Sequence, residues 1–145
     1  MNNLFSFNEI EISYRTKQLG PKIISSKDVF DLMIPNWLDI DYVESFYVIL
    51  LNRSNIVLGV CKISFGSVSG TVADPKKIFQ TALKANASSI VLCHNHPSGN
   101  EKPSTGDNAI TKKCKESGDF LDLPVLDHLI VTRDKYFSYA DEGLL

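Results

Sequence analysis

The sequence has few cysteines, little net charge and no long hydrophobic run, and each deficit excludes a class of protein. No apolar run reaches the ~18 residues that a membrane-spanning helix needs, so we expect no membrane segment. The three cysteines, Cys61, Cys93 and Cys114, are odd in number and scattered, which excludes a disulfide framework and predicts reduced, mostly buried thiols. The N-terminus has neither the cationic start nor the cleavage site of a secretion signal. These features predict a cytoplasmic protein.

The near balance of charge argues against a protein that binds nucleic acid strongly by itself. The 15 basic and 17 acidic side chains leave a net charge of −2, and the sequence pI is near 5.9. Nucleic-acid-binding domains usually have a high pI and a basic face. Two groups of lysines could form a small basic patch: Lys76 and Lys77, and Lys112, Lys113 and Lys115. Solvated helix faces carry such groups as well, and we favour that interpretation.

The length and the order of expected elements indicate one domain with an α/β (α+β) fold. A chain of 145 residues with 43% hydrophobic and 22% charged residues can bury its own core, and no internal repeat or low-complexity linker divides it. Strands are expected at residues 8–14, 46–51, 56–65, 88–94, 123–132 and 136–139. Helices are expected at 28–33 after a Ser25 or Ser26 cap, from Pro75 with Ile78, Phe79, Ala82 and Leu83 buried, and at 104–117, ended by Gly118. Residues 37–46 fit a helix that runs into a strand. The pattern predicts a single sheet with helices packed on it.

One segment carries the strongest chemical signal in the chain. His94-Asn95-His96-Pro97-Ser98-Gly99 is followed by Ser104 and Asp107, which gives the pattern His-x-His-x7-Ser-x-x-Asp. Side chains alternate across an extended strand, so the two histidines point the same way. Two imidazoles and one carboxylate, with a fourth position left for water, are typical of a catalytic zinc site. The pattern therefore predicts a metal-dependent hydrolase with His94, His96 and Asp107 as ligands.

Ser104 and Asp107 also have a structural interpretation. Ser-x-x-Asp before a helical pattern is the signature of a capping box, in which both side chains bind backbone N–H groups. Taken alone, the pair favours capping. The histidines shift the balance toward metal binding, because they end a buried strand, where an unpaired imidazole is costly. The first turn of the next helix would bring Asp107 back toward both rings, while Ser104 could cap the helix with its hydroxyl facing the metal.

Two other residues, Cys93 and His128, are of types that can also bind a metal. Cys93 points to the opposite face from His94 and His96, so we assign it to the core. His128 could be another ligand or the partner of a ligand. No companion ligand lies at metal-type spacing from His128, and we favour a histidine satisfied by hydrogen bonds beneath the sheet.

A zinc hydrolase also needs a base that takes a proton from water, and glutamate is the usual choice. Spacing alone does not choose among the candidates, which are Glu9, Glu11, Glu44, Glu101, Glu116 and Glu142. Glu101 lies in the metal loop, where most glutamates are solvated. Glu44 lies at the start of an apolar strand, where a carboxylate is more often functional.

These motifs resemble the JAMM (MPN-plus) metalloprotease motif and, more narrowly, the RadC-like branch of that family. The resemblance rests on Glu44-Ser45-Phe46, Gly70-Thr71-Val72, residues 93–99, Pro103-Ser104-x-x-Asp107, residues 126–130 and residues 136–139. It runs from about residue 41 to residue 145. We therefore expect an N-terminal strand and helix extension over residues 1–40 and a JAB/MPN domain over residues 41–145, within one globular unit.

The resemblance implies a cytidine-deaminase-like architecture, a mixed sheet flanked by helices, with Zn²⁺ held by His94, His96 and Asp107. It also implies Glu44 as the general base and Ser104 as the group that hydrogen-bonds the reacting oxygen. Two features depart from the branch. Residues 1–40 lack the Gly-rich helix-hairpin-helix region of longer members, which weakens the case for DNA binding in cis. In addition, Asp74-Pro75 stands where many members have His-Pro.

The leading hypothesis is a zinc-dependent hydrolase that cleaves a peptide or isopeptide bond in a peptide or protein substrate. The alternative is a DNA-repair or mobile-element-associated protein, acting as a metal-dependent nuclease or a DNA-binding adaptor. Its support is the association of the RadC name with DNA repair, which is an analogy at family level. A non-catalytic scaffold is disfavoured, because a scaffold has no need for an open metal site.

Overall fold

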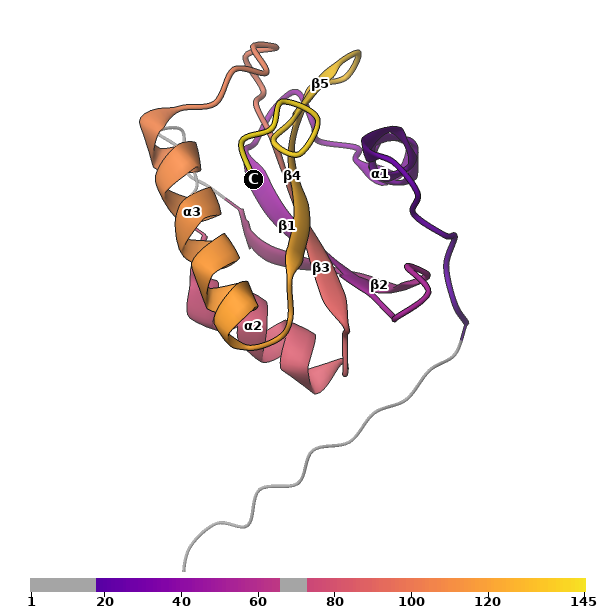
Figure 1. Ribbon diagram of the computed structural model, residues 1–145. Coiled ribbons are helices and arrows are strands. Elements are labelled where there is room, and N and C mark those ends of the chain that lie inside the picture. Colours follow the sequence, from indigo (N-terminus) through magenta and orange to yellow (C-terminus); the bar gives the residue numbers. More distant parts are fainter. Residues whose placement is uncertain (1–17, 66–72) are drawn as a thin grey trace, which may run out of the picture.

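In the part of the chain that the structure describes, five strands form one sheet in the order β2-β1-β3-β4-β5 (Figure 1). The computed structural model describes residues 18–65 and 73–145, so the expected strand at 8–14 and the Gly70-Thr71-Val72 segment lie outside the described residues. The strands are β1 (Ser45–Leu51), β2 (Val57–Phe65), β3 (Ser89–Asn95), β4 (Val125–Val131) and β5 (Tyr136–Ser138). β3 and β4 are parallel, whereas the other neighbouring pairs are antiparallel. The prediction of a single mixed sheet is confirmed.

Helices cover both faces of this sheet. They are α1 (Ser26–Met33), the short 3₁₀ helix η1 (Ile34–Asn36), α2 (Pro75–Lys84) and α3 (Thr105–Phe120). The α-helices begin after Ser25, Asp74 and Ser104, whose side chains accept a backbone N–H of the first turn, as the capping signals predict. Figure 1 shows α2 and α3 on one side of the sheet and α1 on the other. Within the described ranges, no helix is long and apolar enough to cross a membrane.

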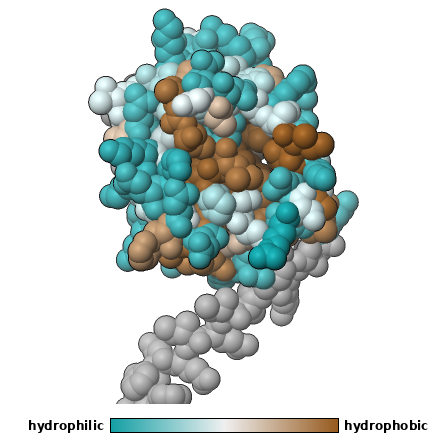
Figure 2. All heavy atoms as spheres, in the orientation of Figure 1, coloured by the Kyte–Doolittle hydropathy of each residue, from teal (hydrophilic) through white to brown (hydrophobic). Residues whose placement is uncertain are grey.

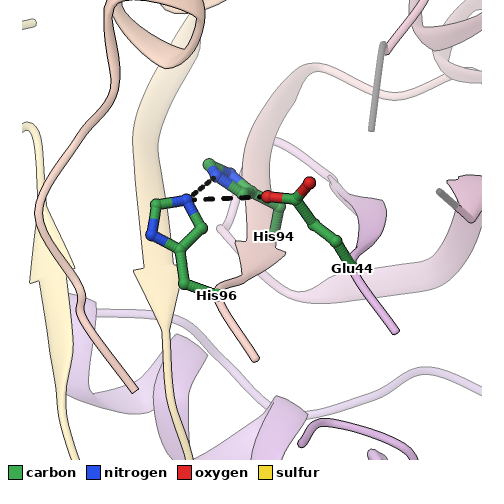
Figure 3. Close-up of side chains that lie close together, drawn as sticks. All are labelled: Glu44, His94 and His96. Atoms are coloured by element: carbon green, nitrogen blue, oxygen red, sulfur yellow. Dashed lines mark hydrogen bonds and ion pairs between the residues drawn. The ribbon is translucent and has the colours of Figure 1, made fainter. Parts of the chain in front are cut away.

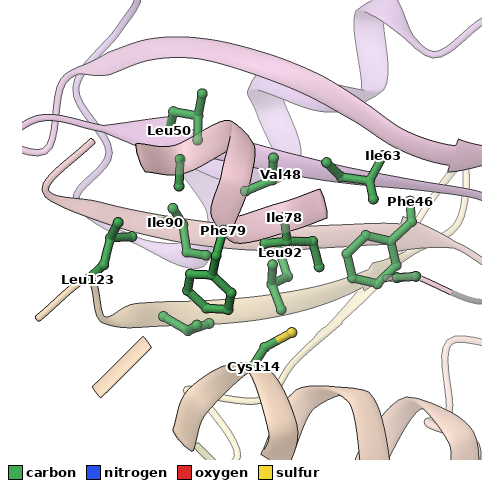
Figure 4. Close-up of a cluster of buried hydrophobic side chains, with 13 residues drawn as sticks. Phe46, Val48, Leu50, Ile63, Ile78, Phe79, Ile90, Leu92, Cys114 and Leu123 are labelled. Atoms are coloured by element: carbon green, nitrogen blue, oxygen red, sulfur yellow. The ribbon is translucent and has the colours of Figure 1, made fainter. Parts of the chain in front are cut away.

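Alternation of side chains along the strands builds two hydrophobic cores. The first lies between the sheet and α2 with α3, where Phe46 and Leu92 pack with Ile78, Phe79 and Cys114 (Figure 4). The second lies on the opposite face, between the sheet and α1, and consists of Ile23, Val29, Met33, Trp37, Ile40, Ile49, Leu51, Val57, Val91, Cys93, Leu129 and Val131. Figure 2 shows hydrophobic residues surfacing in the middle of one face of the molecule, while its margin along α3 is hydrophilic. The strands at the centre of the sheet are therefore covered on both sides.

The strand pairing brings distant parts of the motif together. β1 runs antiparallel to β3 with Phe46 opposite His94, so Glu44, which directly precedes β1, comes beside the end of β3. β4 runs parallel to β3 and places His128 beside Leu92. β1 is not an edge strand, because β2 pairs with its other side in an antiparallel hairpin.

Residues 37–46 do not form the expected helix. Turns occupy residues 38–42, and the chain then enters β1. The spacing of apolar residues suggested a helix with one buried face, but Leu38 and Tyr42 are 89% and 81% exposed, whereas Trp37 and Ile40 are buried. The Asn95 side chain donates a hydrogen bond to the Ile40 carbonyl, so a tertiary contact takes the place of a hydrogen bond within a helix.

Two smaller expectations about the helices are also wrong. α3 does not end at Gly118 but continues to Phe120. Gly118 is needed for packing, because a Cβ at this position would lie 2.5 Å from the Leu123 carbonyl oxygen. In α2, Leu83 is 56% exposed, so the buried face is narrower than the apolar pattern predicts.

Candidate metal centre

Glu44, His94 and His96 point toward one another at one end of the sheet (Figure 3). His94 belongs to β3, His96 follows the end of that strand, and Glu44 precedes β1. One potential ligand atom from each residue lies within 4.8 Å of the other two. The two Nε2 atoms are 3.1 Å apart, and Glu44 Oε1 lies 3.6 Å from His96 Nε2. These three residues form a group that could hold a metal ion.

Asp107 joins the same group from the first turn of α3. Its Oδ1 lies 3.0 Å from His94 Nε2, and its Oδ2 lies 3.3 Å from His96 Nε2. The capping interpretation also holds, because Ser104 Oγ accepts the Asp107 N–H and Asp107 Oδ2 accepts the Ser104 N–H. The carboxylate therefore caps the helix and faces both imidazoles at the same time.

The geometry and the donor set fit a small divalent cation. Neighbouring ligand atoms lie roughly 3.3–3.6 Å apart around a tetrahedral zinc with bonds of about 2.0–2.2 Å. The separations among the His94, His96 and Asp107 atoms, 3.0, 3.1 and 3.3 Å, are close to that scale. His96 Nδ1 lies 2.7 Å from the Asn100 carbonyl oxygen, which can only accept, so the Nδ1 proton is used there and Nε2 is left to bind a metal.

The electrostatics of the group also favour a cation. Burial alone raises the pKa of Asp107, but hydrogen bonds from His94 and His96 outweigh it and hold the pKa of this carboxyl well below its usual value. Burial lowers the pKa of His96, but Asp107, the Asn100 carbonyl and Glu44 outweigh it, so the net shift is upward. Negative charge thus accumulates where the two Nε2 atoms meet, and protons or a metal ion can balance it.

His128 is fully buried and touches the group from β4. Its Nε2 lies 2.8 Å from His94 Nδ1, and its Nδ1 lies 2.6 Å from Thr111 Oγ1. These contacts fit two of the interpretations of His128, a histidine satisfied by hydrogen bonds and the partner of a ligand, because one contact is to the predicted ligand His94. The sequence analysis missed Thr111. The sequence did contain a clue: Thr111 follows Asp107 by four residues, a spacing that places both residues on one face of a helix.

Asn95 is a second residue whose role the motif did not reveal. It is completely buried on the face opposite His94. Its Oδ1 accepts the Ser45 N–H at 2.7 Å, and its Nδ2 donates to the carbonyls of Ile40 and Val43 at 2.7 and 2.8 Å. These bonds fasten the segment before and after Glu44 to the strand that carries both histidines.

We expect Asn95→Ala to lower the free energy of unfolding by about 2–4 kcal/mol, because it leaves buried backbone groups unpaired. It should also lower any activity that needs Glu44 while bound metal is retained. Denaturant unfolding of the metal-free protein measures the first effect. Asn36→Ala is the matched control, since Asn36 is exposed and makes one local bond, and it should stay within about 0.5 kcal/mol of the wild type. Equal stabilities for the two variants would contradict this role of Asn95.

The other predicted residues divide between the site and its surroundings. Glu101 is outside this group and binds Lys135 instead: its Oε2 lies 2.9 Å from Lys135 Nζ, and this bond lowers the pKa of Glu101. Ser104 lies one turn before Asp107 and accepts a bond with its Oγ, which leaves its hydroxyl proton for donation. Cys93 is buried in the core beneath α1, as predicted. The structure thus brings Glu44, and not Glu101, to the histidines, while the catalytic roles of Glu44 and Ser104 stay predictions.

Comparison with known proteins identifies the family of this chain. The chain is 46% identical over 123 residues to a UPF0758 protein of Flavobacterium johnsoniae, a match that covers 85% of this chain and 53% of the relative. It is 38% identical over 129 residues to a UPF0758 protein of Chlorobaculum parvum, covering 89% and 58% of the two chains. The chain therefore spans about half the length of these curated relatives. The family model described as the RadC-like JAB domain matches residues 23–144, and the chain belongs to this family.

Proposed function

We propose that this domain is a zinc-dependent hydrolase that cleaves a peptide or isopeptide bond. The observation that supports it best is the convergence of four side chains: each Nε2 of His94 and His96 lies within 3.0–3.6 Å of a carboxylate oxygen of Asp107 or Glu44. Two imidazoles and a carboxylate are the donor set of catalytic zinc. The resemblance to JAMM metalloproteases supports the choice of substrate class.

The exposure of the site supports catalysis over a structural role. The side chains of Glu44, His96 and Asp107 are 18%, 15% and 15% exposed, whereas that of His94 is 3% exposed. One side of the group is thus anchored in the core, and the other is open to a substrate. A structural zinc site is normally closed by four protein ligands.

Each residue has a role in this proposal that its position allows. Zinc held by His94, His96 and Asp107 would supply a Lewis acid that lowers the pKa of a coordinated water to about 7. Glu44 accepts a proton from the attacking water and passes it to the leaving amine. The Ser104 hydroxyl donates a hydrogen bond to the substrate carbonyl oxygen as negative charge develops on it. Asn95 keeps the Glu44 segment in place.

The first test is the metal content of the purified protein. We expect one zinc per chain in the wild type, and its loss in the variant that combines His94→Ala with His96→Ala. Activity is then screened on peptide and isopeptide libraries, before and after removal and restoration of zinc. Full zinc in the double variant would contradict the site, and a zinc-loaded wild type that hydrolyses neither library would contradict the proposed reaction.

The contacts of the lysines favour the solvated-helix interpretation over a DNA-binding patch. Lys115 pairs with Asp119 one turn further along α3, and Lys112 lies 4.0 Å from Glu116. Lys77 Nζ donates to the Ile63 carbonyl. A salt-titrated binding assay with single- and double-stranded DNA checks the alternative, because phosphate contacts give a steep salt dependence.

A further inference from the structure

A continuous chain of hydrogen bonds links the backbone of α3 to the metal centre. Thr111 Oγ1 lies 2.6 Å from the Asp107 carbonyl oxygen and 2.6 Å from His128 Nδ1. His128 Nε2 then lies 2.8 Å from His94 Nδ1. The far nitrogen of His94 faces the Asp107 carboxylate at 3.0 Å, so the chain leaves α3 at Asp107 and returns to the same residue.

The contact between Thr111 Oγ1 and the Asp107 carbonyl determines which atom donates in each of the other hydrogen bonds of this series. A carbonyl oxygen only accepts, so the single hydroxyl proton of Thr111 lies between Oγ1 and the Asp107 carbonyl. Thr111 must then accept from His128, which places a proton on His128 Nδ1. A fully buried imidazole with no carboxylate on either nitrogen carries one proton, so His128 Nε2 accepts from His94 Nδ1. The reverse direction would bring two acceptor oxygens to 2.6 Å with no proton between them.

We propose that Thr111 and His128 are positioning residues for the metal centre: they hold a proton on His94 Nδ1, so that Nε2 is the nitrogen available to the metal. His96 has the same arrangement, since its Nδ1 proton goes to the Asn100 carbonyl. Outer hydrogen bonds of this kind fix the tautomer and the ring orientation of a ligating histidine. The inference rests on the proposed function, because it assumes that the centre holds a metal.

The packing around the rings fits a positioning role. Thr111, His94 and His128 are 3%, 2% and 0% exposed, so water does not compete for these bonds. The Phe46 ring is stacked on His94, and the Tyr139 ring is stacked on His128. Neither Thr111 nor His128 belongs to the group of potential ligand atoms; His128 contacts His94 at Nδ1, and Thr111 contacts His128. Both act through His94.

Zinc affinity of the metal-free protein, measured by competition with a chelator, tests the proposal. We expect Thr111→Val to weaken zinc binding about 10- to 100-fold, and Thr111→Ser, which keeps the hydroxyl, to change it less than about threefold. Thr81→Val is the matched control, because Thr81 Oγ1 makes the same bond to the carbonyl four residues earlier, on α2. It should leave zinc affinity unchanged. His128→Leu should weaken binding as Thr111→Val does, and His128→Gln, which keeps an acceptor for His94, should restore part of the affinity.

A second measurement does not depend on metal or on the variants. Nitrogen-15 NMR of the imidazole rings in the metal-free wild type reports which ring nitrogens of His94 carry protons. A proton on Nδ1 supports the proposal. A bare Nδ1, or wild-type zinc affinity in folded Thr111→Val and His128→Leu proteins, would overturn it. A wild type that binds no zinc would contradict the proposed function, and the NMR spectrum would still decide the tautomer.

Discussion

Glu44→Gln is expected to retain zinc and the fold while turnover falls by at least about 100-fold, the low end for removal of a general base. Glutamine has nearly the shape of glutamate, but it cannot take a proton from water. Glu44 Oε1 lies 3.6 Å from His96 Nε2, at the edge of the proposed metal position, where a carboxylate can reach a water in the open site. The measurement is turnover of zinc-loaded protein on a substrate found by the peptide and isopeptide screen, together with its zinc content.

Glu101→Gln is the matched control for this prediction. Glu101 lies closer to the histidines in the sequence, but its carboxylate binds Lys135, whereas Glu44 is the glutamate grouped with the histidines. Its substitution should therefore be nearly silent. Loss of turnover in Glu101→Gln with normal turnover in Glu44→Gln would show that the role carried over from the family is wrong for this chain. Loss of zinc from Glu44→Gln would instead indicate that Glu44 is a metal ligand.

Asp107→Asn should weaken zinc binding by more than the roughly 100-fold that loss of an outer hydrogen-bond partner costs, because it removes a charged ligand. The change also weakens the cap of α3, so stability should fall by about 1 kcal/mol. The chain contains a matched control. Ser25 and Asp28 form the same reciprocal capping box on α1, on the other side of the sheet from α3, so Asp28→Asn should cost similar stability and leave zinc affinity unchanged. Equal zinc affinities for the two variants would contradict the assignment of Asp107.

Lowering the pH should also weaken zinc binding, because protons compete with the metal for His96. The pKa of His96 is raised in the folded metal-free protein, so a proton occupies the site below that pKa and must leave when the metal binds. Zinc affinity should therefore rise with pH through the pKa of His96 and then level off. The metal-free fold should respond oppositely: the stability that protonated His96 contributes is present below its unfolded pKa and is lost as pH rises through the raised pKa. Chelator competition and denaturant unfolding across this range measure the two trends.

Local patterns were sufficient to predict most of the elements. α1, α2 and α3 each begin directly after a residue whose side chain caps the first turn, and that preference depends on neighbours only three or four residues away. The β-rich runs became β1 to β5 because a sheet lets their apolar side chains pack into the cores on its two faces. Where a tertiary contact competed with spacing, the prediction was wrong. The Asn95 amide binds the Ile40 and Val43 carbonyls, and residues 38–42 form turns instead of a helix.

In the candidate site, too, some features follow from local sequence and others from the tertiary structure. By itself the sequence determined that His94 and His96 share a face and that a Ser-x-x-Asp box follows them, since both facts depend on residues close together in the chain. The capping box alone does not mark a metal ligand, because Ser25 and Asp28 form the same box; the spacing from the histidines is what pointed to Asp107. Only the tertiary structure decided that one box faces two imidazoles, that the start of β1 brings Glu44 beside the end of β3, and that Thr111 and His128 meet behind His94. The physical reason is that strand order and helix packing, which depend on the burial of the whole core, set the distances between these residues.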